Sequence, residues 1–197
     1  MLFFGHLGLT LGTAAALDVL YTSSKAQACQ TPAAKRAGRL RLSVLPEHVD
    51  LRILLAGSLL PDIIDKPLGI YILGNTFSNG RIVSHTLLFL AVLALAGWFV
   101  YRRWRRTWGL VLAFGTLTHL VFDSMWNRPQ TLFWPFMGAT FPREDSAEWI
   151  GNILHSLFTR PSFYIPEIAG ILVLLVFLMV VLRRKSLGAA VTKGKAL

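Results

Sequence analysis

Apolar residues come in five blocks along the chain, each close to the length of a membrane crossing. Uninterrupted blocks occupy residues 82–101, 107–126 and 165–182, and two further candidates occupy residues 2–20 and 51–73. About 20 apolar helical residues cross the roughly 30 Å of hydrocarbon in a bilayer, and lipid cannot satisfy the backbone of an open sheet. The pattern predicts an all-α, polytopic transmembrane helix bundle of about five spans, a single membrane domain over residues 1–197.

The block at residues 51–73 differs from the others because it contains the stretch GSLLPDIIDKP (Gly57–Pro67). A helix interior tolerates proline poorly, since proline lacks an amide donor and its ring clashes with the preceding turn. We therefore expect this helix to be broken near Pro61 and Pro67.

The connection at residues 127–164 is long for a membrane hairpin and carries an amphipathic pattern. Apolar residues recur on one side of a helix over Asp145–Thr159, at Trp149, Ile150, Ile153, Leu154, Leu157 and Phe158. Asp145 followed by Glu148 fits a capping box, and Pro161 comes just past the end. This pattern predicts an interfacial helix on the outer leaflet.

Composition and charge agree with a membrane protein and indicate its orientation. Hydrophobic residues make up 54% of the 197 residues and charged residues 15%, with a formal net charge of +10. The cations concentrate in the linker 21–50, the turn Arg102–Arg106 and the tail 183–197. Because cytoplasmic loops carry an excess of Lys and Arg, we predict an inner (cytoplasmic) membrane protein of a prokaryote. Its N-terminus lies outside and its C-terminus in the cytoplasm, and we expect no nucleic-acid partner.

The end of the first block contains a possible processing site. Ala26-Gln27-Ala28 resembles a signal-peptidase site, but no Lys or Arg precedes Lys25, so the basic region of a signal peptide is absent. We therefore expect the first block to be retained as a span.

Ionisable side chains inside the predicted spans are costly unless they have a partner or a water-filled cavity. Seven positions qualify: His6, Asp62, Asp65, His85, His119, Asp123 and Glu167. At ~1.5 Å per helical residue, the first six come from four spans to the same outer half of the bilayer. Histidines with carboxylates are a common ligand set for zinc and similar ions. We predict that these six bind a divalent metal, zinc being favoured, as one or two ions.

Several of these positions also have a plainer explanation. Asp62 could pair with Lys66, four residues on, and Asp65 with Arg81; Glu167 could simply cap a helix. Two further histidines fall outside the predicted cluster: His48 in the cytoplasmic linker and His155 on the interfacial helix.

Five short motifs follow one another over residues 3–135: FFGHLGLTLG (Phe3–Gly12), GSLLPDIIDKP (Gly57–Pro67), GRIVSHTLLF (Gly80–Phe89), THLVFD (Thr118–Asp123) and LFWP (Leu132–Pro135). In content and order they resemble the YdjM-like membrane-bound metal-dependent hydrolases. The resemblance places five residues on the family's motif positions: His6, Asp62, His85, His119 and Asp123. Two departures concern the ligand set. Many members carry D-x-D followed by His-Pro where this chain has Asp62, Asp65 and Lys66-Pro67, and a histidine ahead of Arg81 is missing here.

The resemblance implies a hydrolase, and we expect its site to open to the outer half of the bilayer. A bound metal lowers the pKa of its water and so provides a hydroxide nucleophile, with Asp65 or Glu167 as general base. The planar fork of Arg81 suits a phosphate oxygen, which favours a phospholipid or another lipid-like ester or phosphoester as substrate. A divalent metal ion transporter and a non-catalytic, metal-stabilised membrane protein remain alternatives.

Aromatic residues near the outer surface allow two interpretations. Trp126, Phe133, Trp134 and Phe136 would line an access route for a lipid substrate, or they belong to the aromatic belt at the headgroups. The sequence does not specify an oligomeric state.

Overall fold

In the computed structural model of the chain, residues 1–28, 49–74, 78–143 and 149–183 are described, together with positions 188, 190, 192 and 194. They form α1 (Phe3–Ala28), α3 (Leu51–Lys66), α4 (Leu87–Trp104), α5 (Trp108–Phe122), α6 (Pro129–Leu132), α7 (Trp149–Thr159) and α8 (Pro161–Arg183), with a π-helix η1 (Pro67–Ile72) and a 3-10 turn η2 (Met125–Asn127). The described residues contain no strand, which confirms the predicted all-α class for them.

Among the residues that the structure describes, three helices are long and apolar enough to cross a membrane. They are Phe3–Ser24 within α1, Leu87–Trp104 and Pro161–Arg183. Helix α5 is apolar but has 15 residues, which rise about 22 Å, less than the roughly 30 Å of hydrocarbon. A helical membrane protein is therefore supported, while the count of five spans stays a prediction.

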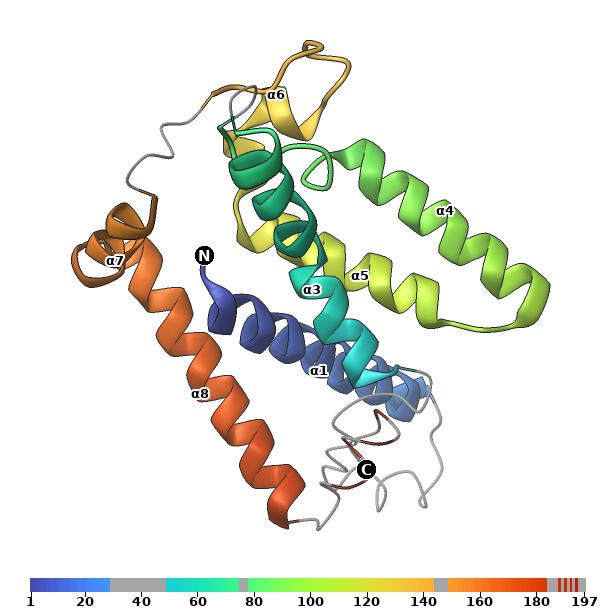
Figure 1. Cartoon of the computed structure of the whole chain (residues 1–197). Helices are drawn as coiled ribbons and strands as arrows, with labels where there is room; N and C mark the ends of the chain where they lie inside the picture. Colours follow the sequence, from blue (N-terminus) through green and yellow to red (C-terminus); the bar gives the residue numbers. More distant parts are fainter. Residues whose placement is uncertain are drawn as a thin grey trace.

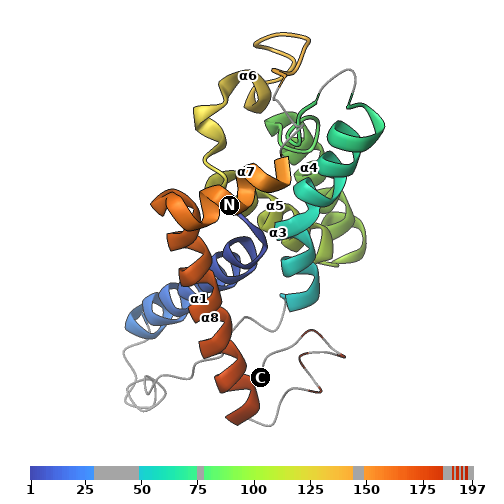
Figure 2. The same ribbon diagram turned by 60° about the vertical axis from the view of Figure 1, so that its left-hand side comes forward.

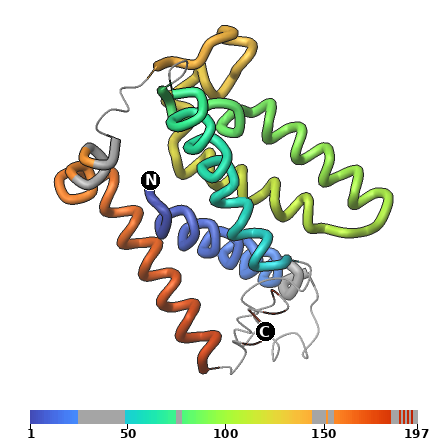
Figure 3. The backbone as a smooth tube through the Cα atoms, viewed as in Figure 1, coloured from blue at the N-terminus to red at the C-terminus, as the bar shows by residue number. Residues whose placement is uncertain are grey.

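Successive long helices run in opposite directions. In Figure 1, α1, α4 and α8 run away from the end that carries α6 and α7, and α3 and α5 run toward it. The trace in Figure 3 follows the same path, and the turned view in Figure 2 shows α7 at the start of α8. The beginnings of α1, α4 and α8 therefore lie at the same end of the bundle as the ends of α3 and α5.

Glycines allow close approach of neighbouring helices. A Cβ at Gly8 of α1 would collide with the backbone of Gly170 in α8, and one at Gly57 of α3 would collide with the carbonyl of Leu112 in α5. Membrane helices commonly meet at small residues, because association there depends on van der Waals contact and interhelical hydrogen bonds. These crossings pair α1 with α8 and α3 with α5, and a hydrogen bond between the hydroxyls of Thr10 and Thr118 at 2.9 Å joins α1 to α5.

The predicted break in the second span is absent at Pro61, whereas the α-helix does end at Lys66, just before Pro67. Pro61 lies inside the continuous helix α3, and at Pro67 the helix continues as η1. Because Pro61 has no N–H, the carbonyl of Gly57 loses its intrahelical donor; the hydroxyl of Thr116 in α5 lies 3.3 Å from that carbonyl and 3.1 Å from the carbonyl of Leu112, so its one proton is shared between them. A neighbouring helix thus replaces part of the lost hydrogen bonding, as is common within membranes.

The helix expected over residues 82–101 begins later, at Leu87. The hydroxyl oxygen of Thr86 caps it by accepting a hydrogen bond from the N–H of Phe89 at 3.0 Å. Residues 82–86 belong instead to the loop that leads into α4.

The outer loop contains the expected helix close to Pro161. The described part of α7 begins at Trp149, ends at Thr159, and Pro161 then begins α8. The predicted N-cap at Asp145 and most of the basic linker, including His48, lie outside the described residues.

Candidate metal centre

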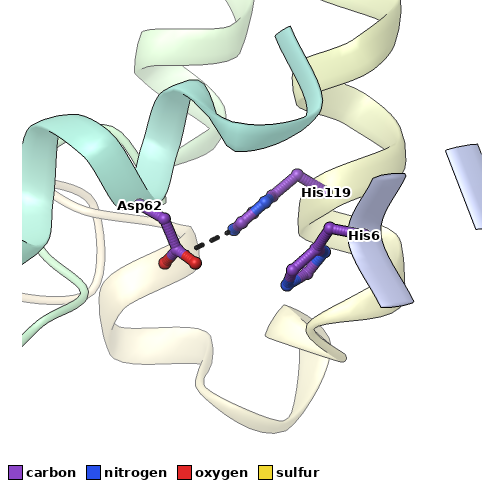
Figure 4. Close-up of side chains that lie close together, drawn as sticks. All are labelled: His6, Asp62 and His119. Atoms are coloured by element: carbon purple, nitrogen blue, oxygen red, sulfur yellow. Dashed lines mark ion pairs between the residues drawn. The ribbon is translucent and has the colours of Figure 1, made fainter. Parts of the chain in front are cut away.

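Three histidines from separate segments meet inside the bundle. His6 lies in the first turns of α1, His119 near the end of α5, and His85 in the loop before α4. All three are completely buried. Figure 4 shows His6 and His119 directed toward Asp62, which projects from α3. The structure therefore brings together side chains that are far apart in the sequence.

Hydrogen bonds fix the protonation pattern of two of these rings. The Nδ1 atom of His119 lies 2.6 Å from the carbonyl oxygen of Ser58. Since a carbonyl only accepts, Nδ1 carries the proton and Nε2 keeps its lone pair. The Nδ1 atom of His85 lies 2.8 Å from Oδ2 of Asp65, and an ionised carboxylate imposes the same tautomer.

The two Nε2 atoms that remain face each other at 3.2 Å. Two lone pairs at this distance cannot form a hydrogen bond without an added proton, so the pair is suited to a shared cation. Two nitrogens that bind one tetrahedral zinc at about 2.0–2.1 Å lie roughly 3.3–3.4 Å apart. The spacing of His85 and His119 fits this geometry.

His6 stands beside this pair without a hydrogen bond of its own. Neither of its buried ring nitrogens has a hydrogen-bond partner, which is costly for a polar group. Its ring stacks on that of His119, with centroids 4.0 Å apart, and its Nε2 lies 3.5 Å from Oδ1 of Asp123. An imidazole in this position is available to a ligand that would complete its coordination.

Two carboxylates face the histidines. Oδ1 of Asp62 lies 3.7 Å from Nε2 of His85 and 3.9 Å from Nε2 of His119, while its Oδ2 accepts from Lys66 at 2.7 Å. Asp123 is the C-cap residue of α5. Of the carboxylate oxygens described around the cluster, Oδ1 of Asp62 alone faces it without accepting a hydrogen bond.

Asp123 is held by two cationic groups as well as by its position at the helix end. Its Oδ1 accepts from the α-amino group of Met1 at 2.7 Å and its Oδ2 from Nε of Arg81 at 2.5 Å. The side chain is 2% exposed. Its charge is therefore largely compensated by neighbours, and its oxygens are fixed in place.

Asp65 lies behind His85 rather than in front of the cluster. It is completely buried and accepts hydrogen bonds from the backbone N–H groups of Ile82, Ser84 and His85 at 2.7–3.2 Å. It therefore folds the loop and orients the His85 ring. The alternative of a pair between Asp65 and Arg81 is wrong, because Arg81 pairs with Asp123.

Glu167 is a cap, but of a helix other than its own. From α8, its two oxygens accept from the N–H of Leu2 at 2.6 Å and of Gly5 at 3.0 Å. The first turn of a helix leaves such donors unsatisfied, and a negative charge there is favourable. Glu167 thus anchors the start of α1, which places His6.

The exposed edge of the cluster carries cations. Lys66 and Arg81 have side chains that are 30% and 27% exposed. Arg81 belongs to the loop before α4; burial disfavours its cation, but the carboxylate of Asp123 outweighs this and raises the pKa of Arg81. Arg128 follows η2 outside the spans, and burial together with the charge of Arg81 lowers its pKa.

The donor set fits a divalent metal. One atom each of His6, Asp62 and His119 lie within 4.8 Å of one another, and so do atoms of His85, His119 and Asp123. The combination of three imidazoles and two carboxylates is typical of zinc and related ions. The unpartnered His6 and the facing Nε2 atoms are the observations on which this fit rests.

The sequence predicted most of the clustered residues, but not the groups that hold their side chains in place by hydrogen bonds. His6, Asp62, His85, His119 and Asp123 meet as expected. The supports that fix the rings and carboxylates were not anticipated: the carbonyl of Ser58, the amides around Asp65 and the Met1 amine. The suggested pair of Asp62 with Lys66 is present and leaves Oδ1 facing the histidines.

The aromatic residues of the outer loop divide into two kinds. Trp126, Phe133 and Phe136 are exposed, Phe136 to 87%. Trp134 packs within the loop, stacked on Phe141 with ring centroids 5.4 Å apart. His155 of α7 is exposed, and its Nδ1 lies 3.5 Å from the hydroxyl oxygen of Thr159, one turn on.

Comparison with known proteins gives one match. The family model described as YdjM inner membrane protein matches residues 1–193. No curated protein and no solved structure matches the chain.

Proposed function

The chain belongs to the YdjM inner membrane protein family, and from its histidine cluster we propose that it is a membrane-embedded, metal-dependent hydrolase. The observation that carries this proposal is the facing pair of Nε2 atoms, His85 and His119, 3.2 Å apart with the unpartnered His6 alongside. A divalent metal bound there would supply a Lewis acid that polarises an ester and activates water.

The imidazoles of His85 and His119 would hold the metal. The separation of their Nε2 atoms is close to that of two ligands on one zinc, whereas Oδ1 of Asp62 lies farther from both, at 3.7 and 3.9 Å. We therefore assign the ligand role first to His85 and His119, and His6, which has ligand atoms near those of His119 and Asp62, would complete the set. Asp62 lies beside them on the side that opens to the surface.

Asp62 is the best-placed proton acceptor of the site. Its Oδ1 accepts no hydrogen bond and faces the histidines, while Lys66 holds Oδ2 and so fixes the orientation of the carboxylate. The sequence favoured Asp65 or Glu167 as general base, but the oxygens of both accept from buried backbone amides. A base must reach the proton that it removes, and Asp62 meets this condition.

The remaining polar residues position these groups. Asp65 and the carbonyl of Ser58 fix the tautomers of His85 and His119. Partners of this kind orient metal-binding histidines and commonly affect metal affinity 10–100-fold. Asp123 holds Arg81 and lies next to His6.

The position of the cluster favours a lipid-like substrate. It lies at the end of the bundle where α1 and α8 begin, and both contain candidate spans. The exposed aromatics of the adjacent loop, Trp126, Phe133 and Phe136, are suited to the headgroup region. We propose an ester or phosphoester of a membrane lipid as substrate, with the site facing the outer leaflet of the inner membrane.

A turnover assay tests this proposal. Purified protein in lipid nanodiscs is incubated with ester and phosphoester lipids, with and without a chelator, and released products are identified. We expect product that disappears with chelator, returns on addition of zinc and is absent in the His119→Ala variant. Metal binding without turnover on any lipid would contradict the enzyme and leave a metal-stabilised membrane protein.

A second candidate, a divalent metal ion transporter, is favoured by one observation. One face of α1 carries His6, Thr10, Ala14 and Asp18 at four-residue spacing, all buried. Ala14 and Asp18 also line a cavity of about 310 Å³ between α1, α3 and α5, away from the histidines. Chelator-sensitive metal flux into proteoliposomes, lost in Asp18→Asn, would favour transport over hydrolysis.

A further inference from the structure

Two cationic side chains lie at the exposed edge of the histidine cluster, and metal binding does not require them. They are Lys66 at the end of α3 and Arg81 in the loop before α4. Both Lys66 and Arg81 are partly exposed, beside carboxylates that face the buried rings. Positively charged groups therefore lie between the protein surface and the proposed metal site.

Arg81 presents an unused hydrogen-bonding fork. Only its Nε donates to Asp123, and its two terminal nitrogens donate to no other residue that the structure describes. The backbone N–H of Arg81 bonds the side-chain oxygen of Asn79 at 2.8 Å, and Asn79 also donates to the carbonyl of Pro142. The guanidinium is thus held by one edge on a fixed loop, with the other edge available to a ligand.

Lys66 lies next to the same loop. Its Cγ is 3.5 Å from the position that a Cβ of Gly80 would take, so its stem crosses the loop one residue before Arg81. Its ammonium group reaches Asp62 at 2.7 Å. Lys66 and Arg81 therefore flank the carboxylate assigned above as proton acceptor.

We propose that Lys66 and Arg81 bind a phosphate group and present it to the histidine cluster. The terminal nitrogens of an arginine match two oxygens of a phosphate, and such charge-assisted hydrogen bonds are stronger than neutral ones. The reaction that follows binding rests on the proposed function, but binding itself does not require a metal. The phosphate could belong to a lipid headgroup or be free in solution.

The test measures phosphate binding without turnover. Purified, chelator-treated protein in detergent micelles is titrated calorimetrically with dihexanoyl phosphatidic acid, dihexanoyl glycerol and inorganic phosphate. We expect the phosphate-bearing lipid to bind at least tenfold more tightly than the uncharged lipid. Inorganic phosphate within threefold of the lipid indicates a site for the free anion, and a larger gap indicates a headgroup site; both support the phosphate site.

Variants identify the residues that bind. Arg81→Lys keeps a charge beside Asp123 but removes the fork, and Lys66→Gln removes the ammonium group that lies beside Asp62. Each should weaken phosphatidic acid binding at least tenfold. Arg160→Gln removes an exposed cation at the α7–α8 junction, on the same outer end, and should change binding by less than twofold.

Failure of this inference is separable from failure of the proposed function. Equal binding of charged and uncharged lipid, or equal losses in Arg81→Lys and Arg160→Gln, overturns the phosphate site even if the protein binds zinc and hydrolyses lipid. Selective phosphate binding by a protein that neither holds metal nor turns over lipid supports the phosphate site and overturns the hydrolase.

Discussion

The Nε2 atoms of His85 and His119 face each other at 3.2 Å, while the Nδ1 atom of each ring is held by an acceptor. In ordinary packing, one of two facing nitrogens carries a hydrogen and donates it. Here the carbonyl of Ser58 and the carboxylate of Asp65 require both protons on the far side of the rings. This pairing of lone pairs is the feature of the bundle that most strongly indicates a bound cation.

Asp65→Asn should weaken metal binding without removing a ligand. The amide retains one oxygen but loses the negative charge that orients His85, and a loss of such a partner commonly costs 10–100-fold in metal affinity. The zinc dissociation constant of the purified variant, measured with a competing chelator, checks this. Asp50→Asn is the matched control, because Asp50 pairs with Arg52 at the other end of α3; an equal effect in both variants would contradict the role of Asp65.

Asp62→Asn should separate metal binding from proton transfer. The variant keeps the three histidines and so should retain most of its metal. Removal of a general base typically slows a reaction by about 10²–10⁴-fold. Metal content and turnover are measured on the same preparation; a variant that hydrolyses lipid at the wild-type rate would exclude Asp62 as the base.

Glu167→Gln should lower stability while sparing the metal. Two amides at the start of α1, those of Leu2 and Gly5, lose a charged acceptor, and loss of a helix cap costs about 0.5–2 kcal/mol. Thermal unfolding in detergent should therefore begin at lower temperature, with metal content unchanged. The opposite result, lost turnover at unchanged stability, would restore Glu167 as a catalytic base.

Gly115→Ala should disturb the site through packing alone. A Cβ there would meet the carbonyl of Leu54 and the N–H of Ser58 in α3, and overpacking of this kind costs about 1–3 kcal/mol. Because Ser58 also holds His119, zinc affinity should fall together with the unfolding temperature. Gly151→Ala, at a glycine of α7 with nothing within 4 Å of the added Cβ, should leave both unchanged; a shift as large as that of Gly115→Ala would refute this explanation.

The sequence predicted the helical class and the identity of the clustered residues for a physical reason. Charged and imidazole groups inside apolar blocks have few tolerable locations, so His6, His119 and Asp62 could be expected to find one another. Counting helical residues along each span placed these side chains at a similar depth in the bilayer. Hydropathy and charge were sufficient for this step.

The details that sequence did not predict all depend on contacts between helices. Pro61 removes a backbone hydrogen bond within α3, but the hydroxyl close to the freed carbonyl belongs to Thr116 of α5, far along the chain. Glu167 caps α1 rather than α8, which no spacing within α8 reveals. Asp65 accepts amides from a loop 17–20 residues away, and the late start of α4 follows from that loop.

Elemental analysis of purified protein tests the metal centre most directly. Wild-type protein should carry about one equivalent of zinc or a similar divalent ion per chain, and His119→Ala should lose most of it, while His155→Ala, at an exposed histidine of α7, should retain it. Full metal content in His119→Ala, or none in the wild type after purification with zinc supplied, would contradict the assignment of these histidines as a metal site.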